Sequence, residues 1–356
     1  MTTRILAVLS KAPTPTFYFL LFTFYVLFFT FYFPLTATAQ WTPPLTPDGK
    51  PDLQGTWLNQ SATPLERPKE FAGRALLTDE EVAEFKRRAA RIFNVNTDSD
   101  FPGGDNFFQA LMANPDRYAS TTATGSATVM IERTIEHRTS LIMDPPDGKM
   151  PAMTPDGRAR FDRTPPPTAA GMKHPPAGPA DLSNALRCIT YGTPRVGLQN
   201  INAAGPMGYY QILQTPGYVT LTLEAIHETR IIPLDGRPHL PQGVRLWSGD
   251  SRGRWEGNTL VVDTTNFSPK SNFMGAAQNL HIVERFTRVA ENTLQYEVVV
   301  DDPTTWTKPW TVMIRMNRTQ DKIYEYACHE GNYNTMEGIL GAARADEAAG
   351  KGELRK

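Results

Sequence analysis

The chain has 356 residues, of which 40% are hydrophobic and 21% charged, a composition typical of a globular protein and unlike that of a fibre or a disordered chain. A formal net charge of −1 without a long basic stretch argues against a protein that binds the nucleic-acid backbone. The two cysteines exclude a disulfide-dense mini-domain and a four-cysteine zinc ribbon, and the 30 prolines argue against a helical bundle.

Residues 1–39 have the layout of a secretory signal peptide. Arg4 and Lys11 provide a basic start, the apolar run 17–33 follows, and small residues precede a cleavage point after Ala39. The alternative is an uncleaved membrane anchor, for which the apolar run is short. Cleavage would leave a mature chain without a membrane span, exported to the periplasm or the extracellular space.

Export would place both cysteines in an oxidising compartment, where a Cys188–Cys328 disulfide is the simplest interpretation. Two free buried thiols and a thiol nucleophile are the alternatives. His329 follows Cys328 directly, but adjacent side chains point to opposite faces of the strand expected there. That arrangement disfavours a catalytic Cys–His pair.

Residues 40–180 are predicted to form a loop-rich N-terminal segment that packs on a β-rich core. A short strand is expected at 55–57. The clearest helix is Thr78–Phe93, because Thr78 and Glu81 form a capping box and apolar residues follow at helical spacing.

The rest of this segment carries weaker signals. Residues 94–125 are polar with turn signals, and 129–143 is predicted to form one or two strands. Residues 141–180 are rich in proline and poor in long apolar side chains. They are therefore expected to form a surface excursion or a lid.

Residues 181–335 are predicted to form an antiparallel up-and-down β-barrel, because closure would remove the exposed edges of a long meander. The segment 219–232 alternates apolar and polar residues and is expected to be one long strand. A polar C-terminal tail is expected at 336–356. The predicted strands are 209–213, 219–232, 244–248, 258–265, 281–289, 293–300, 310–316 and 323–328.

Two sets of motifs resemble known families. The triplet Gly55-Thr56-Trp57, followed by a helix and many strands, is similar to the opening of lipocalin-like barrels, which implies a pocket for a hydrophobic small molecule. The run 247–264, Trp-Ser-Gly-Asp-Ser-Arg-Gly-Arg-Trp-Glu-Gly-Asn-Thr-Leu-Val-Val-Asp-Thr, resembles the signature of a family of exported bacterial proteins of unassigned function. Segments 51–57, 232–239 and 326–333 resemble further motifs of that family, which implies export but no particular reaction.

Familiar catalytic motifs are disfavoured. Residues 249–253 match the Gly-x-Ser-x-Gly pattern, but a hairpin rather than the required helix is expected after them. Residues 224–228 resemble a helical zinc motif, yet their surroundings favour a strand on which Glu224 and His227 face opposite sides. Neither a paired Cys-x-x-Cys nor a nucleotide-binding fingerprint occurs, so neither a metal nor a nucleotide cofactor is expected.

Titratable residues among apolar neighbours are the candidates for acid–base chemistry. A carboxylate on an apolar face must be paired or pushed towards neutrality. The structural alternatives are a core histidine at His227 and ion pairs of the carboxylates with Arg285, Arg288 or Arg315. The predicted catalytic residues are His227, Asp263, Glu284 and Tyr326. The predicted ligand-binding residues are Arg285, Trp306, Trp310 and His329.

Three functions are compatible with this pattern. The first is an enzyme that acts on an apolar small molecule by elimination, hydration, isomerisation or cyclisation. The second is a non-catalytic lipocalin-like binder of a hydrophobic ligand, and the third is a cell-envelope interaction module that uses 141–180 as its contact surface. The enzyme requires His227, Asp263 and Glu284 to converge on one cavity. A barrel filled by its own side chains would favour the interaction module.

Overall fold

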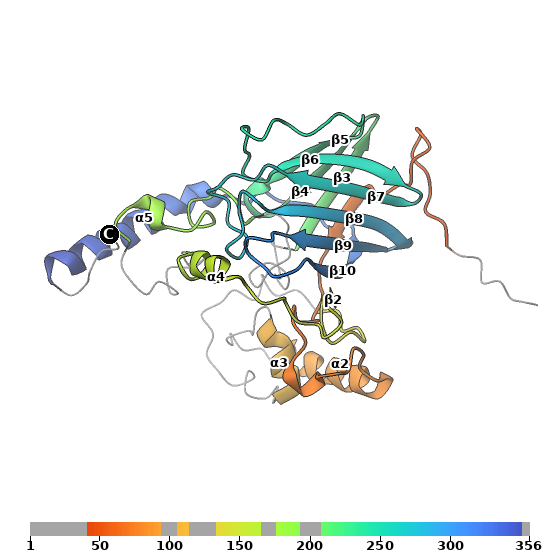
Figure 1. Ribbon diagram of the computed structural model, residues 1–356. Coiled ribbons are helices and arrows are strands. Elements are labelled where there is room, and N and C mark those ends of the chain that lie inside the picture. Colours follow the sequence, from red (N-terminus) through yellow and green to blue (C-terminus); the bar gives the residue numbers. More distant parts are fainter. Residues whose placement is uncertain (1–40, 94–104, 114–132, 165–175, 193–207, 351–356) are drawn as a thin grey trace, which may run out of the picture. The chain divides into compact units, whose positions relative to one another are not determined.

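The computed structural model describes residues 41–93, 105–113, 133–164, 176–192 and 208–350, so the predicted signal peptide at 1–39 lies outside the described residues. The chain from Pro43 onward forms one compact unit that is mainly β. Its strands join in a single 10-stranded antiparallel sheet (Figure 1). In the order of hydrogen-bonded neighbours the sheet runs β5-β4-β3-β1-β10-β9-β8-β7-β6, and β2 also pairs with β10.

The strands and helices have the following bounds. The strands are β1 (Gly55–Leu58), β2 (Ile142–Asp144), β3 (Tyr209–Thr215), β4 (Tyr218–Leu223), β5 (Thr229–Pro233), β6 (Asp250–Glu256), β7 (Thr259–Thr265), β8 (His281–Ala290), β9 (Thr293–Asp301) and β10 (Trp310–Thr319). The α-helices are α2 (Asp79–Phe93), α3 (Asp105–Ala113), α4 (Pro155–Asp162) and α5 (Cys328–Ala348). Short 3-10 turns lie at η1 (Lys69–Phe71), η5 (Pro179–Asp181) and η7 (Ala225–His227).

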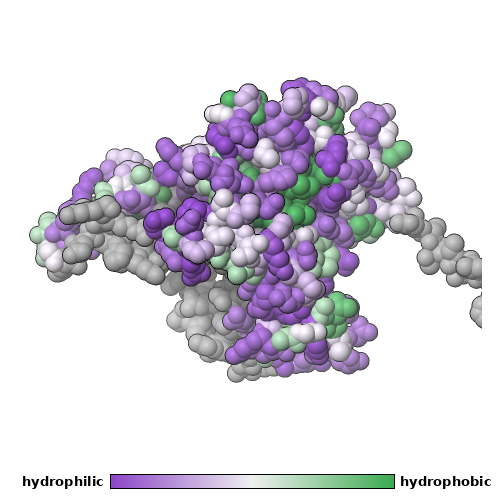
Figure 2. All heavy atoms as spheres, viewed as in Figure 1, coloured by the Kyte–Doolittle hydropathy of each residue, from purple (hydrophilic) through white to green (hydrophobic). Residues whose placement is uncertain are grey.

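One face of the sheet forms the core, because side chains alternate between the two faces of every strand. On β8 and β9 every second residue is buried, and Phe286 lies opposite both Leu260 and Tyr296 in neighbouring strands. Large fully buried side chains, including Trp57 and Trp310, fill this face. Hydrophilic side chains cover most of the surface seen in Figure 2, as expected when the apolar ones gather inside.

The two end strands of the sheet, β5 and β6, contact each other although they do not pair through backbone hydrogen bonds in the sheet order. Gly253 of β6 makes this approach possible. A Cβ atom there would lie 2.5 Å from Leu234 and 2.8 Å from Ile232 of the other edge. The sheet therefore curls until its edges meet through side-chain packing, and its core is shared by strands from both ends.

Several predicted elements are confirmed. The strand at 55–57 is β1, and the helix at 78–93 is α2. Its capping box forms as expected, since Thr78 N donates to Glu81 Oε2 at 2.8 Å and Glu81 N donates to Thr78 Oγ1 at 3.2 Å. The predicted strands at 209–213, 258–265, 281–289, 293–300 and 310–316 correspond to β3, β7, β8, β9 and β10.

The single long strand predicted at 219–232 is wrong. The chain reverses at η7, where Ile226 and His227 have positive φ angles of 58° and 40°. The result is the hairpin of β4 and β5. Ala225 continues the alternation of the flanking strands and the turn contains no Gly, Pro or Asn, so only apolar Ile226, at a polar position of the pattern, departs from period two.

The predictions for 244–248 and for the C-terminal residues are also wrong. Residues 244–248 form a turn before β6, held by an isolated bridge between Leu246 and Phe267. The predicted strand at 323–328 is irregular up to Ala327, and α5 begins at Cys328. This helix continues through much of the predicted polar tail, of which residues 351–356 lie outside the described part.

The N-terminal segment contains more helix and less strand than predicted. The polar stretch 94–125 includes α3, and the described part of 129–143 contributes only the short β2 and isolated bridges. Within the proline-rich stretch, α4 begins at Pro155 after its cap Thr154, whose Oγ1 accepts from Gly157 N at 2.9 Å. Gly157 is needed because a Cβ there would lie 2.5 Å from the carbonyl oxygen of Thr305.

Within the described ranges, none of the helices is both long and apolar enough to cross a membrane.

Candidate functional site

Glu284, a predicted catalytic residue, lies inside the curled sheet in a buried ion pair. Arg230 Nη1 donates to its Oε2 at 2.6 Å, and Arg230 Nη2 donates to its Oε1 at 2.9 Å. Tyr296 Oη donates to the same Oε1 at 2.7 Å. The predicted arginine partners are therefore wrong for Glu284, because the pairing residue comes from β5, a strand at one end of the sheet order.

The charges of this cluster stabilise one another. Burial disfavours the charged guanidinium, but the Glu284 carboxylate outweighs this effect and raises the pKa of Arg230 above its ordinary value. Burial and the same carboxylate raise the pKa of Tyr296 well above its ordinary value, so the phenol keeps its proton. The cavity beside them has a volume of about 10 Å³, room for no more than one water. Glu284 therefore has a structural partner and no space for a substrate.

A second cluster, the Asp–His chain, consists of Asp250, His239, Asp263 and His281. His239 Nδ1 lies 2.9 Å from Asp250 Oδ2, and His239 Nε2 lies 3.0 Å from Asp263 Oδ1. The other oxygen of Asp263, Oδ2, lies 3.1 Å from His281 Nε2. Two carboxylates and two imidazoles thus alternate in one continuous series of hydrogen bonds.

Two features bring the residues of the Asp–His chain together: the register of β7 and β8, and a loop before β6 that is held by hydrogen bonds. Asp263 of β7 lies opposite Val283 of β8, which makes His281 its diagonal neighbour on the same face. Asp250, which is 5% exposed, accepts hydrogen bonds from Leu240 N at 2.9 Å and from Arg252 Nη1 at 2.6 Å. These bonds hold the loop that precedes β6 and fix the imidazole of His239 between the two carboxylates.

The electrostatics at the exposed end of the Asp–His chain favour the charged forms of Asp263 and His281. The hydrogen bond from His281 lowers the pKa of Asp263, and the same contact raises the pKa of His281. The side chain of His281 is 41% exposed. Its Nε2 is held by Asp263, and no hydrogen bond to Nδ1 is found among the described residues. The arrangement resembles a histidine oriented by a carboxylate, which is how general acids and bases are positioned.

His227, Asp263 and Glu284 do not converge. Asp263 and Glu284 occupy opposite faces of neighbouring strands, since Glu284 lies opposite Val262 rather than Asp263. His227 is exposed at the end of η7 instead of lying on an apolar strand face. The central cavity that would have united them is filled by side chains.

The predicted ligand-binding residues are also dispersed. Arg285 lies on the outer face and pairs with Glu256 at 2.8 Å. Trp306 and Trp310 are fully buried and pack against each other with ring centroids 5.5 Å apart, so they are core residues. His329 is exposed in the first turn of α5.

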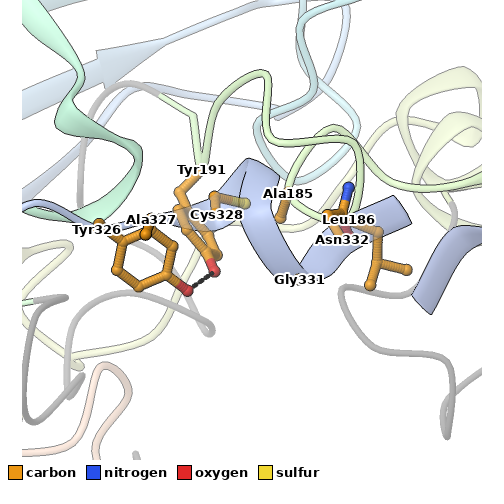
Figure 3. Close-up of a pocket in the computed structure, with 8 residues that line it drawn as sticks. All are labelled: Ala185, Leu186, Tyr191, Tyr326, Ala327, Cys328, Gly331 and Asn332. Carbon is orange, nitrogen blue, oxygen red and sulfur yellow. Dashed lines mark hydrogen bonds between the residues drawn. The ribbon is translucent and has the colours of Figure 1, made fainter. Parts of the chain in front are cut away.

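Tyr326 lies beside a pocket of about 370 Å³ rather than on a strand. Figure 3 shows its hydroxyl directed at that of Tyr191, and the two oxygens are 3.1 Å apart. Cys328 also lines the pocket and is bonded to Cys188, which confirms the predicted disulfide. Disulfides are typical of proteins in oxidising compartments.

Sequence reasoning singled out Asp263 but missed its two histidines. A signal was present, because the quoted motifs meet at this site: His239 ends the segment 232–239, and both aspartates belong to the run 247–264. His281 lies outside every quoted motif, and only strand register places it here. Among the described residues no group of three or more His, Cys, Asp or Glu side chains could hold a metal ion.

Comparisons with known proteins give few matches. No family model and no curated protein matches the chain. Among solved structures, the chain is similar to a crystal structure of a point mutant of the fluorescent protein UnaG, at 12% identity with a TM-score of 0.21. The match covers 32% of this chain and 72% of that chain. A TM-score this low establishes neither a shared fold nor a ligand.

Proposed function

We propose that this protein is an exported acid–base catalyst that acts on an apolar small molecule at the Asp–His chain. The observation that carries the proposal is the uninterrupted hydrogen-bonded series from buried Asp250 to exposed His281. The filled interior removes the central cavity assumed in the sequence-based enzyme hypothesis. The proposed site therefore lies on the outer face of β6, β7 and β8.

Each group has a distinct role in this proposal. His281 exchanges the proton with the substrate through Nδ1. Asp263 is a positioning residue that holds Nε2 and stabilises the imidazolium formed when His281 accepts a proton. His239 and Asp250 keep Asp263 in place. None of the four residues of the Asp–His chain has to act as a nucleophile. The proposed reaction is therefore proton transfer at a carbon atom of the substrate, followed by elimination or isomerisation.

An apolar surface beside the Asp–His chain supports the proposal that the substrate is apolar. Leu240, Val244 and Leu246 of the loop between β5 and β6 are 37%, 43% and 42% exposed. Arg245 Nη1 donates to the carbonyl oxygen of Gln278 at 2.7 Å, which ties this loop to the segment leading into β8 and His281. Desolvation by these side chains would strengthen the electrostatic effect of Asp263.

We also propose that the curled sheet is a lipocalin-like up-and-down barrel whose last seam, between β5 and β6, is packed rather than hydrogen-bonded. The close approach at Gly253 supports closure. Export is supported by the disulfide and by the signal-like residues 1–39.

Ring opening of 5-nitrobenzisoxazole tests the acid–base proposal, because a base removes one carbon-bound proton from this apolar aromatic compound as its N–O bond breaks. We expect catalysis by the wild-type chain, and a loss of about 100-fold in kcat/KM for His281→Gln, the lower end for general-base catalysis. His227→Gln, which changes an exposed histidine outside the Asp–His chain, should retain full activity. Equal rates for the wild-type chain and His281→Gln would contradict the proposal.

A further inference from the structure

A pocket that shares no residue with the Asp–His chain lies between two segments distant in sequence. Residues 185–191 form one wall, and residues 326–332, which lead into α5, form the other (Figure 3). Its volume of about 370 Å³ falls within the range of small-molecule sites. The interior cavity of the sheet, at about 10 Å³, cannot take such a ligand.

The lining of this pocket selects an uncharged ligand. None of the residues that line it carries a charge, and a charged ligand would lose hydration there without a countercharge. The rings of Tyr191 and Tyr326 meet edge to face at 6.4 Å, and Leu186 adds an aliphatic surface. The amide of Asn332 and the hydroxyl of Tyr326 provide polar groups at the pocket wall for a polar substituent. This chemistry fits a flat aromatic molecule with one or two uncharged polar groups.

The Cys188–Cys328 disulfide joins the two walls covalently. Each wall is also attached separately to the hairpin of β4 and β5: Thr190 Oγ1 donates to Glu228 Oε2 at 2.8 Å, and Tyr324 N donates to Glu224 Oε2 at 3.2 Å. Cleavage of the disulfide would leave each wall tethered to the sheet but remove the covalent link between the walls, with the Tyr191–Tyr326 hydrogen bond remaining between them. The bond thus controls the shape of the pocket more than the integrity of the sheet.

We propose that this pocket binds an uncharged aromatic small molecule and that the Cys188–Cys328 disulfide keeps it in the binding form. Reduction by a dithiol breaks the S–S bond, adds two electrons and two protons to give two thiols, and converts the dithiol into its own disulfide. The walls then separate and the ligand is released. The protein thereby couples ligand release to a reducing environment.

The first test uses N-phenyl-1-naphthylamine, an uncharged aromatic probe whose fluorescence rises in an apolar site. We expect saturable binding to the oxidised full chain and at least tenfold weaker binding to Tyr326→Ala. Tyr324→Ala is the matched control, because that side chain is 71% exposed and does not line the pocket. Absence of binding to the wild-type chain, or equal binding by Tyr326→Ala, would overturn the proposed site.

The second test is reduction of the chain, whose only two cysteines form this disulfide. A phosphine reductant, and separately the double variant Cys188→Ala/Cys328→Ala, should weaken probe binding at least tenfold while the far-ultraviolet circular dichroism of the sheet persists. Tyr326→Phe keeps the ring and removes one hydroxyl, so it reports on the pocket should the alanine variant fail to fold. Unchanged affinity after complete reduction would overturn control by the disulfide and leave the binding site intact.

Discussion

At the scale of single residues, partners rather than side-chain type decide the roles of the titratable groups. Glu284 and Asp263 both lie on strands among apolar neighbours. Glu284 is 1% exposed and paired with Arg230, whereas Asp263 is 29% exposed and bonded to two histidines. Alternation predicted that Glu284 points inward, but its partner comes from a strand 54 residues away in the sequence. Long-range ion pairs of this kind leave no local signal.

Removal of one charge from the buried pair should destabilise the fold. Glu284→Gln leaves the buried Arg230 guanidinium without the carboxylate that binds it, and we expect a loss of about 3–5 kcal/mol in the free energy of unfolding. The double variant Arg230→Met/Glu284→Leu should regain most of this loss, since an apolar pair of similar volume is often neutral. Urea denaturation measures both. If Glu284→Gln proved at least as stable as the double variant, the assignment of a buried ion pair between Arg230 and Glu284 would be contradicted.

The contact between His281 and Asp263 should make stability depend on pH. The pKa of His281 is higher in the folded chain than its value near 6.5 in the unfolded chain. Its contribution to the stability of the fold is therefore complete below about pH 6.5 and is lost as the pH rises through the higher pKa of the folded chain. The pKa of Asp263 is lower in the folded chain than its ordinary value of about 3.8. Its contribution to the stability of the fold is therefore present above about pH 3.8 and is lost as the pH falls through the lower pKa of the folded chain.

Denaturation midpoints across pH 3 to 9 test this window, together with NMR titration of the imidazole. The wild-type chain should lose stability relative to His281→Gln above about pH 6.5. The exposed contact makes the effect modest, because solvent screens it. A His281 titration midpoint below that of an unfolded peptide would exclude the predicted direction.

At the scale of elements, hairpin turns built from apolar residues conceal strand boundaries. Ala225 and Ile226 are both buried in the turn of the hairpin between β4 and β5, and no Gly, Pro or Asn marks the reversal. His227 is consequently exposed on a turn. By contrast, the break between the strands predicted at 281–289 and 293–300 matches the turn between β8 and β9, because polar Glu291 and Asn292 interrupt the pattern there.

The seam between β5 and β6 should tolerate no side chain at Gly253. Gly253→Val would press against Ile232 and Leu234, and we expect a loss of about 1–3 kcal/mol from overpacking. Gly243→Val is a suitable control because a Cβ there meets nothing within 4 Å. Thermal unfolding of both variants measures the difference. Equal stabilities would argue that the two edges of the sheet do not pack as described.

At the scale of the whole molecule, one covalent bond joins segments 140 residues apart in the sequence. The predicted pairing of the two cysteines is correct, and it followed from the count and the expected export alone. The prediction that Cys328 ends a strand is wrong, because the bond instead joins a turn to the start of α5. The cysteine count determines the pairing, but the secondary structure around it depends on packing.

Loss of the disulfide should lower global stability by increasing the entropy of the unfolded chain. For a closed loop this long we expect Cys188→Ala/Cys328→Ala to lose about 2–5 kcal/mol in the free energy of unfolding. Guanidinium denaturation under oxidising conditions measures the loss. Addition of a reductant should destabilise the wild-type chain by the same amount and leave the double variant unchanged. A reductant effect on the double variant would contradict the assignment.

The sequence by itself determined the mainly β class, the capped helix α2, most strand positions and the one pairing that a disulfide could have. These features depend on local periodicity, capping residues and composition. Only the tertiary structure decided that Arg230 neutralises Glu284, that the hairpin turn exposes His227, and that His239 and His281 meet Asp263. The physical reason is that strand register and sheet curvature bring together residues far apart in sequence, and these depend on the packing of the whole core rather than on any segment.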